Sequence, residues 1–119
     1  MHKKFNFFEP YLNEFVIDSL SKSILNNDIG YTETVFKFED ELKKFGLTSP
    51  VCLNSNSSGL VIALKALGVA HGDEVIIPRQ TFIATGLAVL EVGAKPIFCD
   101  INISTGSLDL RSVEKLITS

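Results

Sequence analysis

The chain has few cysteines and prolines and no excess of positive charge. An abundance of any of these would point to a particular class of protein. Its 119 residues include only two cysteines and four prolines, and no low-complexity stretch is long enough to be a linker. Cys52 and Cys99 each lie inside an apolar run, where a cysteine usually behaves as a small buried hydrophobic residue. A disulfide framework or a metal site is therefore the minority interpretation, and we expect a reducing, cytoplasmic location.

The charge balance argues against nucleic acid as a partner. Eleven basic residues stand against fourteen acidic ones, whereas a protein that neutralises the phosphates of a duplex normally has a basic face. No window is long and apolar enough to span a membrane, and no apolar stretch follows the N-terminal charges as in a targeting signal. We expect neither a nucleic-acid nor a membrane partner.

Several familiar catalytic and binding patterns are also missing. The dinucleotide fingerprint and the Walker pattern need glycines and a lysine at fixed positions, and the chain does not have them. His71 lies in a turn, where we expect it to be exposed, and no nucleophile and base can be matched with a third partner. The sequence therefore predicts no hydrolytic triad.

Two amphipathic helices are predicted in the N-terminal part of the chain. Apolar side chains recur at helical spacing over residues 11–26, and Gly30 follows the end of this segment. Thr32 can cap a second helix, whose apolar stripe stops at Gly46. We expect the acid-rich face of this helix, which includes Glu39, to be solvated. Residues 1–48 would then form a helical arm.

From residue 49 onward the pattern alternates between strand and helix. Short apolar runs predict strands near residues 51–53, 74–78 and 96–99. The helices between them stop at Gly68 and Gly93, and a last helix begins after Asp109. Near-continuous apolar strands separated by helices are typical of an α/β protein, with a parallel sheet covered on both faces.

The run Asn54-Ser55-Asn56-Ser57-Ser58-Gly59 is the most informative segment, because it lies between an apolar run and a helix. Such a turn leaves backbone N–H groups unpaired at the positive end of the helix dipole, where a phosphate fits. Asn56, Ser57 and Ser58 are the candidate ligands. The same residue types are also usual helix caps, so the turn alone does not require a ligand.

Two more candidates follow predicted strands. Phe82 is either a core aromatic or a ring that stacks on a planar heterocycle. Asp100 is either a loop cap or a polar group of the binding crevice. Because the carboxyl ends of parallel strands meet at one edge, we expect Ser57 and Phe82 to face the same crevice.

Three linked motifs follow one another along the chain: Gly72-Asp73-Glu74-Val75-Ile76-Ile77-Pro78, Thr81-Phe82-Ile83-Ala84-Thr85 and Gly93-Ala94-Lys95-Pro96-Ile97-Phe98-Cys99-Asp100-Ile101. Together they resemble the DegT/DnrJ/StrS family of pyridoxal-phosphate-dependent sugar aminotransferases. The similarity extends from about Gly30 to Thr118. It implies the N-terminal part of the large domain of the three-layer α/β/α fold, which is aspartate aminotransferase-like (fold type I). Residues 49–119 would be a partial cofactor-binding domain.

The resemblance implies pyridoxal 5′-phosphate as cofactor, with its phosphate on Asn56, Ser57 and Ser58 and its ring against Phe82. The family's turn commonly reads Ser-Gly-Thr, so Asn56 replaces the glycine and Ser57 keeps the hydroxyl of the threonine. Asparagine tolerates left-handed backbone angles better than most residues, which favours a preserved turn. For a full-length enzyme the resemblance also implies a nucleotide-sugar substrate, glutamate as amino donor and a homodimer.

The catalytic part of the family's site has no match in the sequence. The aspartate that pairs with the ring nitrogen and the lysine that holds the cofactor have no counterpart before Ser119. None of Lys65, Lys95 and Lys115 ends a predicted strand. We therefore assign no catalytic residue and expect an N-terminal portion of an enzyme of polysaccharide or aminosugar biosynthesis, inactive alone. Two alternatives stay open: a cofactor-dependent sugar dehydratase of the same family, and a non-catalytic fragment that binds a partner.

Overall fold

The computed structural model describes residues 10–118 and divides the chain into two compact units. One unit ends at Cys52 and the other begins at Leu53. The proposed domains, an arm over residues 1–48 and an α/β part over residues 49–119, remain a prediction. Their outermost residues, 1–9 and 119, lie outside the described part of the chain.

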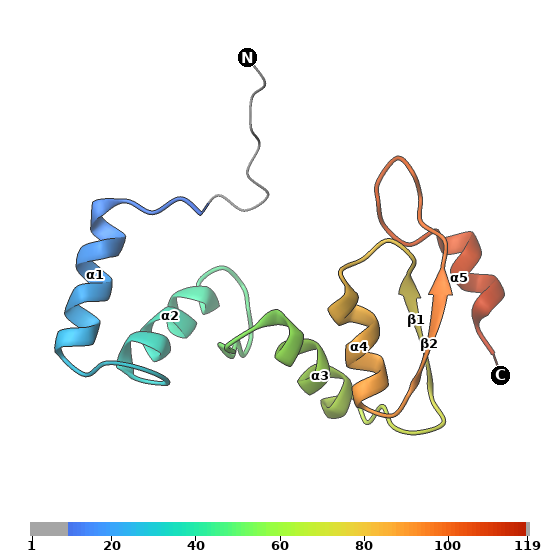
Figure 1. Cartoon of the computed structure of the whole chain (residues 1–119), viewed down its shortest axis with the longest axis horizontal. Coiled ribbons are helices and arrows are strands. Elements are labelled where there is room, and N and C mark those ends of the chain that lie inside the picture. Colours follow the sequence, from blue (N-terminus) through green and yellow to red (C-terminus); the bar gives the residue numbers. More distant parts are fainter. Residues whose placement is uncertain (1–9, 119) are drawn as a thin grey trace, which may run out of the picture. The chain divides into compact units, whose positions relative to one another are not determined.

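The first unit contains the helices α1 (Glu14–Leu25) and α2 (Glu33–Lys43) (Figure 1). Asn13 caps α1, since its side chain accepts a backbone N–H of the first turn. Asn27 ends this helix segment with a φ of +56°, a left-handed angle that asparagine tolerates. Thr32 precedes α2 as predicted, although its side chain makes no capping hydrogen bond.

Glu39 contradicts the prediction of a fully solvated polar face on α2. Only 8% of this residue is exposed. Its two carboxylate oxygens accept hydrogen bonds from the Tyr31 hydroxyl, at 2.8 and 2.9 Å, and Oε1 also accepts one from the Cys52 backbone N–H at 2.8 Å. A carboxylate can be buried when such donors satisfy it. The helical pattern could not reveal this, because both donors lie outside the helix.

The second unit contains α3 (Asn56–Ala66), β1 (Glu74–Pro78), α4 (Ile83–Glu91), β2 (Lys95–Cys99) and α5 (Leu110–Leu116). The strands β1 and β2 pair in parallel, with Glu74 opposite Lys95 and Pro78 opposite Cys99. Figure 1 shows α4 and α5 on opposite sides of this strand pair. The parallel pairing and the covering helices confirm the predicted α/β class.

The strand predicted near residues 51–53 does not form. Within the described residues the sheet consists of β1 and β2 only. The Cys52 N–H donates to the Glu39 carboxylate instead of a strand ladder, and the Val51 side chain is largely exposed. An apolar run of three residues becomes a strand only when a partner strand takes up its backbone groups.

The predicted helix stops and the buried cysteine are confirmed. Gly68 and Gly93 adopt φ values of +79° and +80°, the left-handed geometry that ends many helices. Cys99 has no exposed surface, whereas Cys52, which was also expected to be buried, is only half-buried; both cysteines are free. The core of this unit is formed by side chains from β1, α4 and the turn before β2, namely Ile77, Val89 and Ala94, with Leu64, Val69, Val75 and Val92 packed around them.

Two glycines allow a matched test of this fold. Gly93→Ala should lower the free energy of unfolding by about 1–2 kcal/mol, because a side chain disfavours its left-handed angle. Gly86 lies inside α4, and a Cβ there would lie 3.6 Å from Ile77 Cδ1, an ordinary contact. Gly86→Ala should therefore raise stability by up to about 1 kcal/mol. Urea unfolding measures both, and a Gly93→Ala chain as stable as the original would contradict the assigned turn.

Candidate functional site

The residues predicted to bind a phosphate form the start of α3. Ser55 is the N-cap residue: its Oγ accepts the Ser58 N–H at 3.1 Å and lies 3.0 Å from the Ser58 Oγ, to which it donates. Within the described residues, the N–H groups of Asn56 and Ser57 have no acceptor, and neither does the Ser57 hydroxyl. These free donors lie at the positive end of an eleven-residue helix.

The backbone of this turn is helical from its first residue. Asn56 begins α3, and among the described non-glycine residues only Asn27 has a positive φ. The tolerance of asparagine for left-handed angles is therefore not used at Asn56. Gly59 matters for a different reason, since a Cβ at this residue would lie 3.3 Å from Leu53 Cδ1. The missing side chain lets Leu53 pack closely against the first turn.

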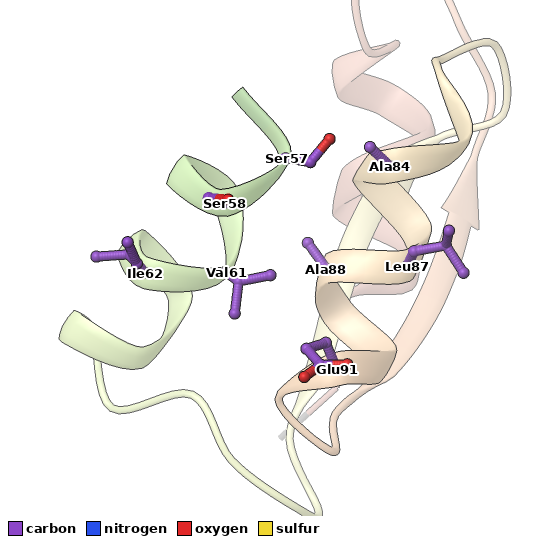
Figure 2. Close-up of a pocket in the computed structure, with 8 residues that line it drawn as sticks. All are labelled: Ser57, Ser58, Val61, Ile62, Ala84, Leu87, Ala88 and Glu91. Carbon is purple, nitrogen blue, oxygen red and sulfur yellow. The ribbon is translucent and has the colours of Figure 1, made fainter. Parts of the chain in front are cut away.

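Ser57 and Ser58 line a groove of about 440 Å³ between α3 and α4. Figure 2 shows Ser57 near Ala84 at one end of the groove and Glu91 at the other. The remaining lining side chains are aliphatic: Val61, Ile62, Leu87 and Ala88. The hydroxyl groups and the only carboxylate of this lining are thus at opposite ends.

Phe82 lines a different cavity from Ser57. It is the N-cap residue of α4 and is 74% exposed, so it is not a core aromatic. Its cavity, of about 400 Å³, is bordered by apolar side chains of α4 and β2 and by Arg79. The structure does not bring Phe82 and Ser57 into one cavity, so their joint role in one site stays a prediction.

Arg79 is a polar residue at the carboxyl edge of the sheet that the sequence analysis did not select as a candidate site residue. The Arg79 side-chain Nε lies 3.2 Å from Asp100 Oδ1, and the backbone N–H of Arg79 donates to the Cys99 carbonyl at 2.9 Å. Both charged side chains are about two-thirds exposed, so the pair adds little to stability. The position of Arg79 directly after a predicted strand could have marked it as a candidate site residue.

The loop after β2 is organised by Asn102, whose side chain accepts hydrogen bonds from two backbone N–H groups.

The lysines considered as cofactor ligands lie away from strand carboxyl ends. Lys65 is in the last turn of α3, at the opposite end from Ser57, and Lys115 is in the last turn of α5. Lys95 is the first residue of β2, and its ammonium group pairs with Glu74 at 2.8 Å. Hydrogen bonding to Lys95 lowers the pKa of the Glu74 carboxyl. None of them is a candidate catalytic residue in the described structure.

Residues 10–118 contain no group of three or more histidine, cysteine or acidic side chains placed to hold a metal ion. No helix in this part of the chain is both long and apolar enough to cross a membrane.

The parallel strands with helices on both sides and the free donors at α3 define an α/β protein with a candidate phosphate site. The chain belongs to the DegT/DnrJ/EryC1/StrS aminotransferase family, whose model matches residues 10–119. The predicted family resemblance is thereby confirmed.

Two curated relatives show how sequence identity and coverage vary among the proteins that this chain matches. The chain is 45% identical over 71 residues to L-glutamine:2-deoxy-scyllo-inosose aminotransferase of Streptomyces fradiae, which covers 58% of this chain and 17% of the relative. It is 30% identical over 116 residues to dTDP-4-dehydro-2,3,6-trideoxy-D-glucose 4-aminotransferase of Saccharopolyspora spinosa, covering 95% of this chain and 30% of the relative. The chain thus spans less than a third of the length of these relatives.

Solved structures agree with this assignment. The PMP form of the putative sugar aminotransferase Spr1654 from Streptococcus pneumoniae superposes with a TM-score of 0.88 at 30% identity, covering 98% of this chain and 30% of that one. The E. coli GDP-4-keto-6-deoxy-D-mannose-3-dehydratase superposes with a TM-score of 0.83 at 22% identity over 93% of this chain and 30% of that one, which shows the fold alone. The predicted fold class, the aspartate aminotransferase-like α/β fold (fold type I), is confirmed.

Proposed function

We propose that this chain is the part of a pyridoxal-phosphate-dependent sugar aminotransferase that binds the phosphate of the cofactor. The observation that carries the proposal is the pair of free N–H groups of Asn56 and Ser57 at the start of α3. Family membership and the PMP-form structure of the Streptococcus pneumoniae protein support it.

The donors at this helix start fit a phosphate dianion. A phosphate accepts hydrogen bonds only, and the turn offers two backbone N–H groups and the Ser57 hydroxyl. The Ser58 Oγ accepts a hydrogen bond from the Ser55 hydroxyl. The hydroxyl hydrogen of Ser58 itself is therefore free to point to a ligand. The groove's carboxylate, Glu91, lies at the far end of the groove from Ser57.

When bound, the cofactor supplies the electron sink that amino transfer requires. The residues of this chain bind and orient it. The N–H groups of Asn56 and Ser57 and the hydroxyls of Ser57 and Ser58 hold the phosphate, and we propose the exposed ring of Phe82 as the stacking surface for the pyridine ring. Holding a reactant in one orientation is itself a large part of catalysis.

For the whole protein we propose transfer of an amino group to a nucleotide-linked keto sugar, by a cytoplasmic homodimer. The name of the Saccharopolyspora spinosa relative supports a nucleotide-linked sugar. The name of the Streptomyces fradiae relative contains L-glutamine, so glutamine joins glutamate as a candidate amino donor. The dehydratase alternative has weaker support, because its example is similar in fold alone.

A comparison of two ligands that differ only in the phosphate tests this proposal. Calorimetric titration with pyridoxamine phosphate and with pyridoxamine avoids the reaction of an aldehyde with surface lysines. We expect the phosphate to tighten binding by at least about tenfold, because a single charge-assisted hydrogen bond contributes about 1.5–3 kcal/mol. Equal affinities, or no binding of pyridoxamine phosphate, would contradict the proposal.

A further inference from the structure

The cavity that Phe82 borders has a pair of opposite charges at its mouth, which the proposed function does not use. All residues of this cavity belong to the second unit. Arg79 lines the cavity directly after β1, and its partner Asp100 directly follows β2. The backbone N–H of Arg79 donates to the Cys99 carbonyl, so the ends of the two parallel strands bring the charges together.

Most of the hydrogen-bonding capacity of this charge pair is free. Arg79 Nε lies 3.2 Å from Asp100 Oδ1, but within residues 10–118 neither side chain makes a hydrogen bond. A guanidinium group has further N–H donors on its two outer nitrogens, and a carboxylate has acceptor positions on both oxygens. Arg79 can therefore bind a carboxylate of a ligand while Asp100 accepts an ammonium group.

The rest of the cavity lining carries no charge and is mostly apolar. Ile77 and Phe98 lie opposite each other in the strand pair, and Leu90 of α4 faces the same cavity. Phe98 and Leu90 are more than half exposed, so a ligand that covers them removes apolar surface from water. Gly86 of α4 has no side chain to fill the space. The volume of about 400 Å³ falls within the range of small-molecule sites, about 300–1,000 Å³.

We propose that this cavity binds a free α-amino acid with a large apolar side chain, such as L-phenylalanine. The ligand carboxylate contacts the Arg79 guanidinium, the ligand ammonium contacts the Asp100 carboxylate, and the side chain lies against Leu90 and Phe98. An α-amino acid carries its two charges on one carbon atom, which matches two opposite protein charges only 3.2 Å apart. The inference goes beyond the proposed function, because it needs neither the turn at Ser57 nor the cofactor.

Other charged ligands match this cavity less well. A phosphate dianion on Arg79 would lie close to the Asp100 carboxylate, which repels it, whereas the ammonium group of an amino acid offsets that repulsion. A fatty acid or an alkyl amine meets only one of the two charges. A charged ligand side chain, as in glutamate, would lose its water without a partner, since Arg79 is the only charged residue of the lining.

A titration of the ¹⁵N-labelled chain with L-phenylalanine tests the proposal. We expect saturable shifts of the Phe98 and Leu90 amide signals and none in α5, which lies on the other side of the strand pair. L-Alanine lacks the large apolar group, 3-phenylpropionate lacks the ammonium group and 2-phenylethylamine lacks the carboxylate. Each should bind at least about tenfold more weakly than L-phenylalanine.

Three single substitutions assign the binding to the charge pair. Arg79→Gln and Asp100→Asn each remove one charge with little change in shape, and each should weaken L-phenylalanine binding by at least about tenfold. Arg111→Gln is the matched control: Arg111 is an exposed arginine of α5, and its variant should bind within about twofold of the original. All three residues are exposed, so the urea midpoints should stay unchanged and a lost affinity cannot come from unfolding.

Several results would overturn the inference. The site does not exist if L-phenylalanine shows no saturable binding, or if Arg79→Gln binds it as tightly as the original chain. Equal affinity for 3-phenylpropionate would show that Asp100 takes no ammonium group, which rules out an amino-acid site. These titrations contain no cofactor, so their outcome is independent of the phosphate site proposed at α3.

Discussion

Replacing Ser57 by aspartate should strongly weaken the binding of pyridoxamine phosphate. The new carboxylate would lie at the second residue of α3, beside the proposed phosphate position. Two like charges about 4 Å apart near a protein surface repel each other by about 4 kcal/mol. Loss of the Ser57 hydroxyl adds to this effect. We therefore expect calorimetric titration to show binding weakened by at least about 100-fold.

The same substitution should not destabilise the fold, which makes the result specific. An acidic side chain in the first turn of a helix is favourable by about 0.3–1 kcal/mol, because it complements the helix dipole. Ser104→Asp is the matched control: it makes the same change in the exposed loop after β2 and should bind the ligand within about twofold of the original. A Ser57→Asp chain that binds normally would exclude the phosphate site at α3.

Replacing Val89 by aspartate should remove most of the stability of the second unit. Val89 is 1% exposed and packs in the cluster with Ile77 and Ala94. A carboxylate there would have no partner, and an uncompensated buried charge costs about 3–5 kcal/mol, a large share of the total for a small domain. Urea unfolding measures the effect, either as a lower free energy of unfolding or as the loss of the cooperative transition.

Leu87→Asp is the control for this core substitution. Leu87 lies in the same helix but is 54% exposed, so its replacement should cost less than about 1 kcal/mol. Equal losses in the two variants would mean that Val89 does not lie in a tightly packed core.

Features encoded by neighbouring residues could be predicted from the sequence. The strands β1 and β2 are short apolar runs between helices, a pattern that favours parallel pairing. Gly68 and Gly93 end helices because left-handed angles are easy for glycine. Asp109 caps α5 because its side chain reaches an N–H two residues on. Each of these signals lies within a few residues of its effect.

Features that depend on distant residues could not be predicted in this way. The burial of Glu39 depends on Tyr31 and Cys52, which lie eight residues before it and thirteen after it. The same bond explains why the run around Cys52 is not a strand. For the site, the sequence indicated which residues follow strands, but the cavity that each side chain lines depends on packing. Ser57 and Phe82 consequently line two cavities.

The most direct test of the phosphate site is the pyridoxamine phosphate titration followed by the amide resonances of the ¹⁵N-labelled chain. The proposal predicts that the N–H signals of Asn56 and Ser57 shift most, with one common saturation curve, because phosphate oxygens accept hydrogen bonds from these groups. Pyridoxamine without phosphate should leave both signals nearly unmoved. Saturable binding with the largest shifts elsewhere, and none at Asn56 and Ser57, would contradict the proposed phosphate site.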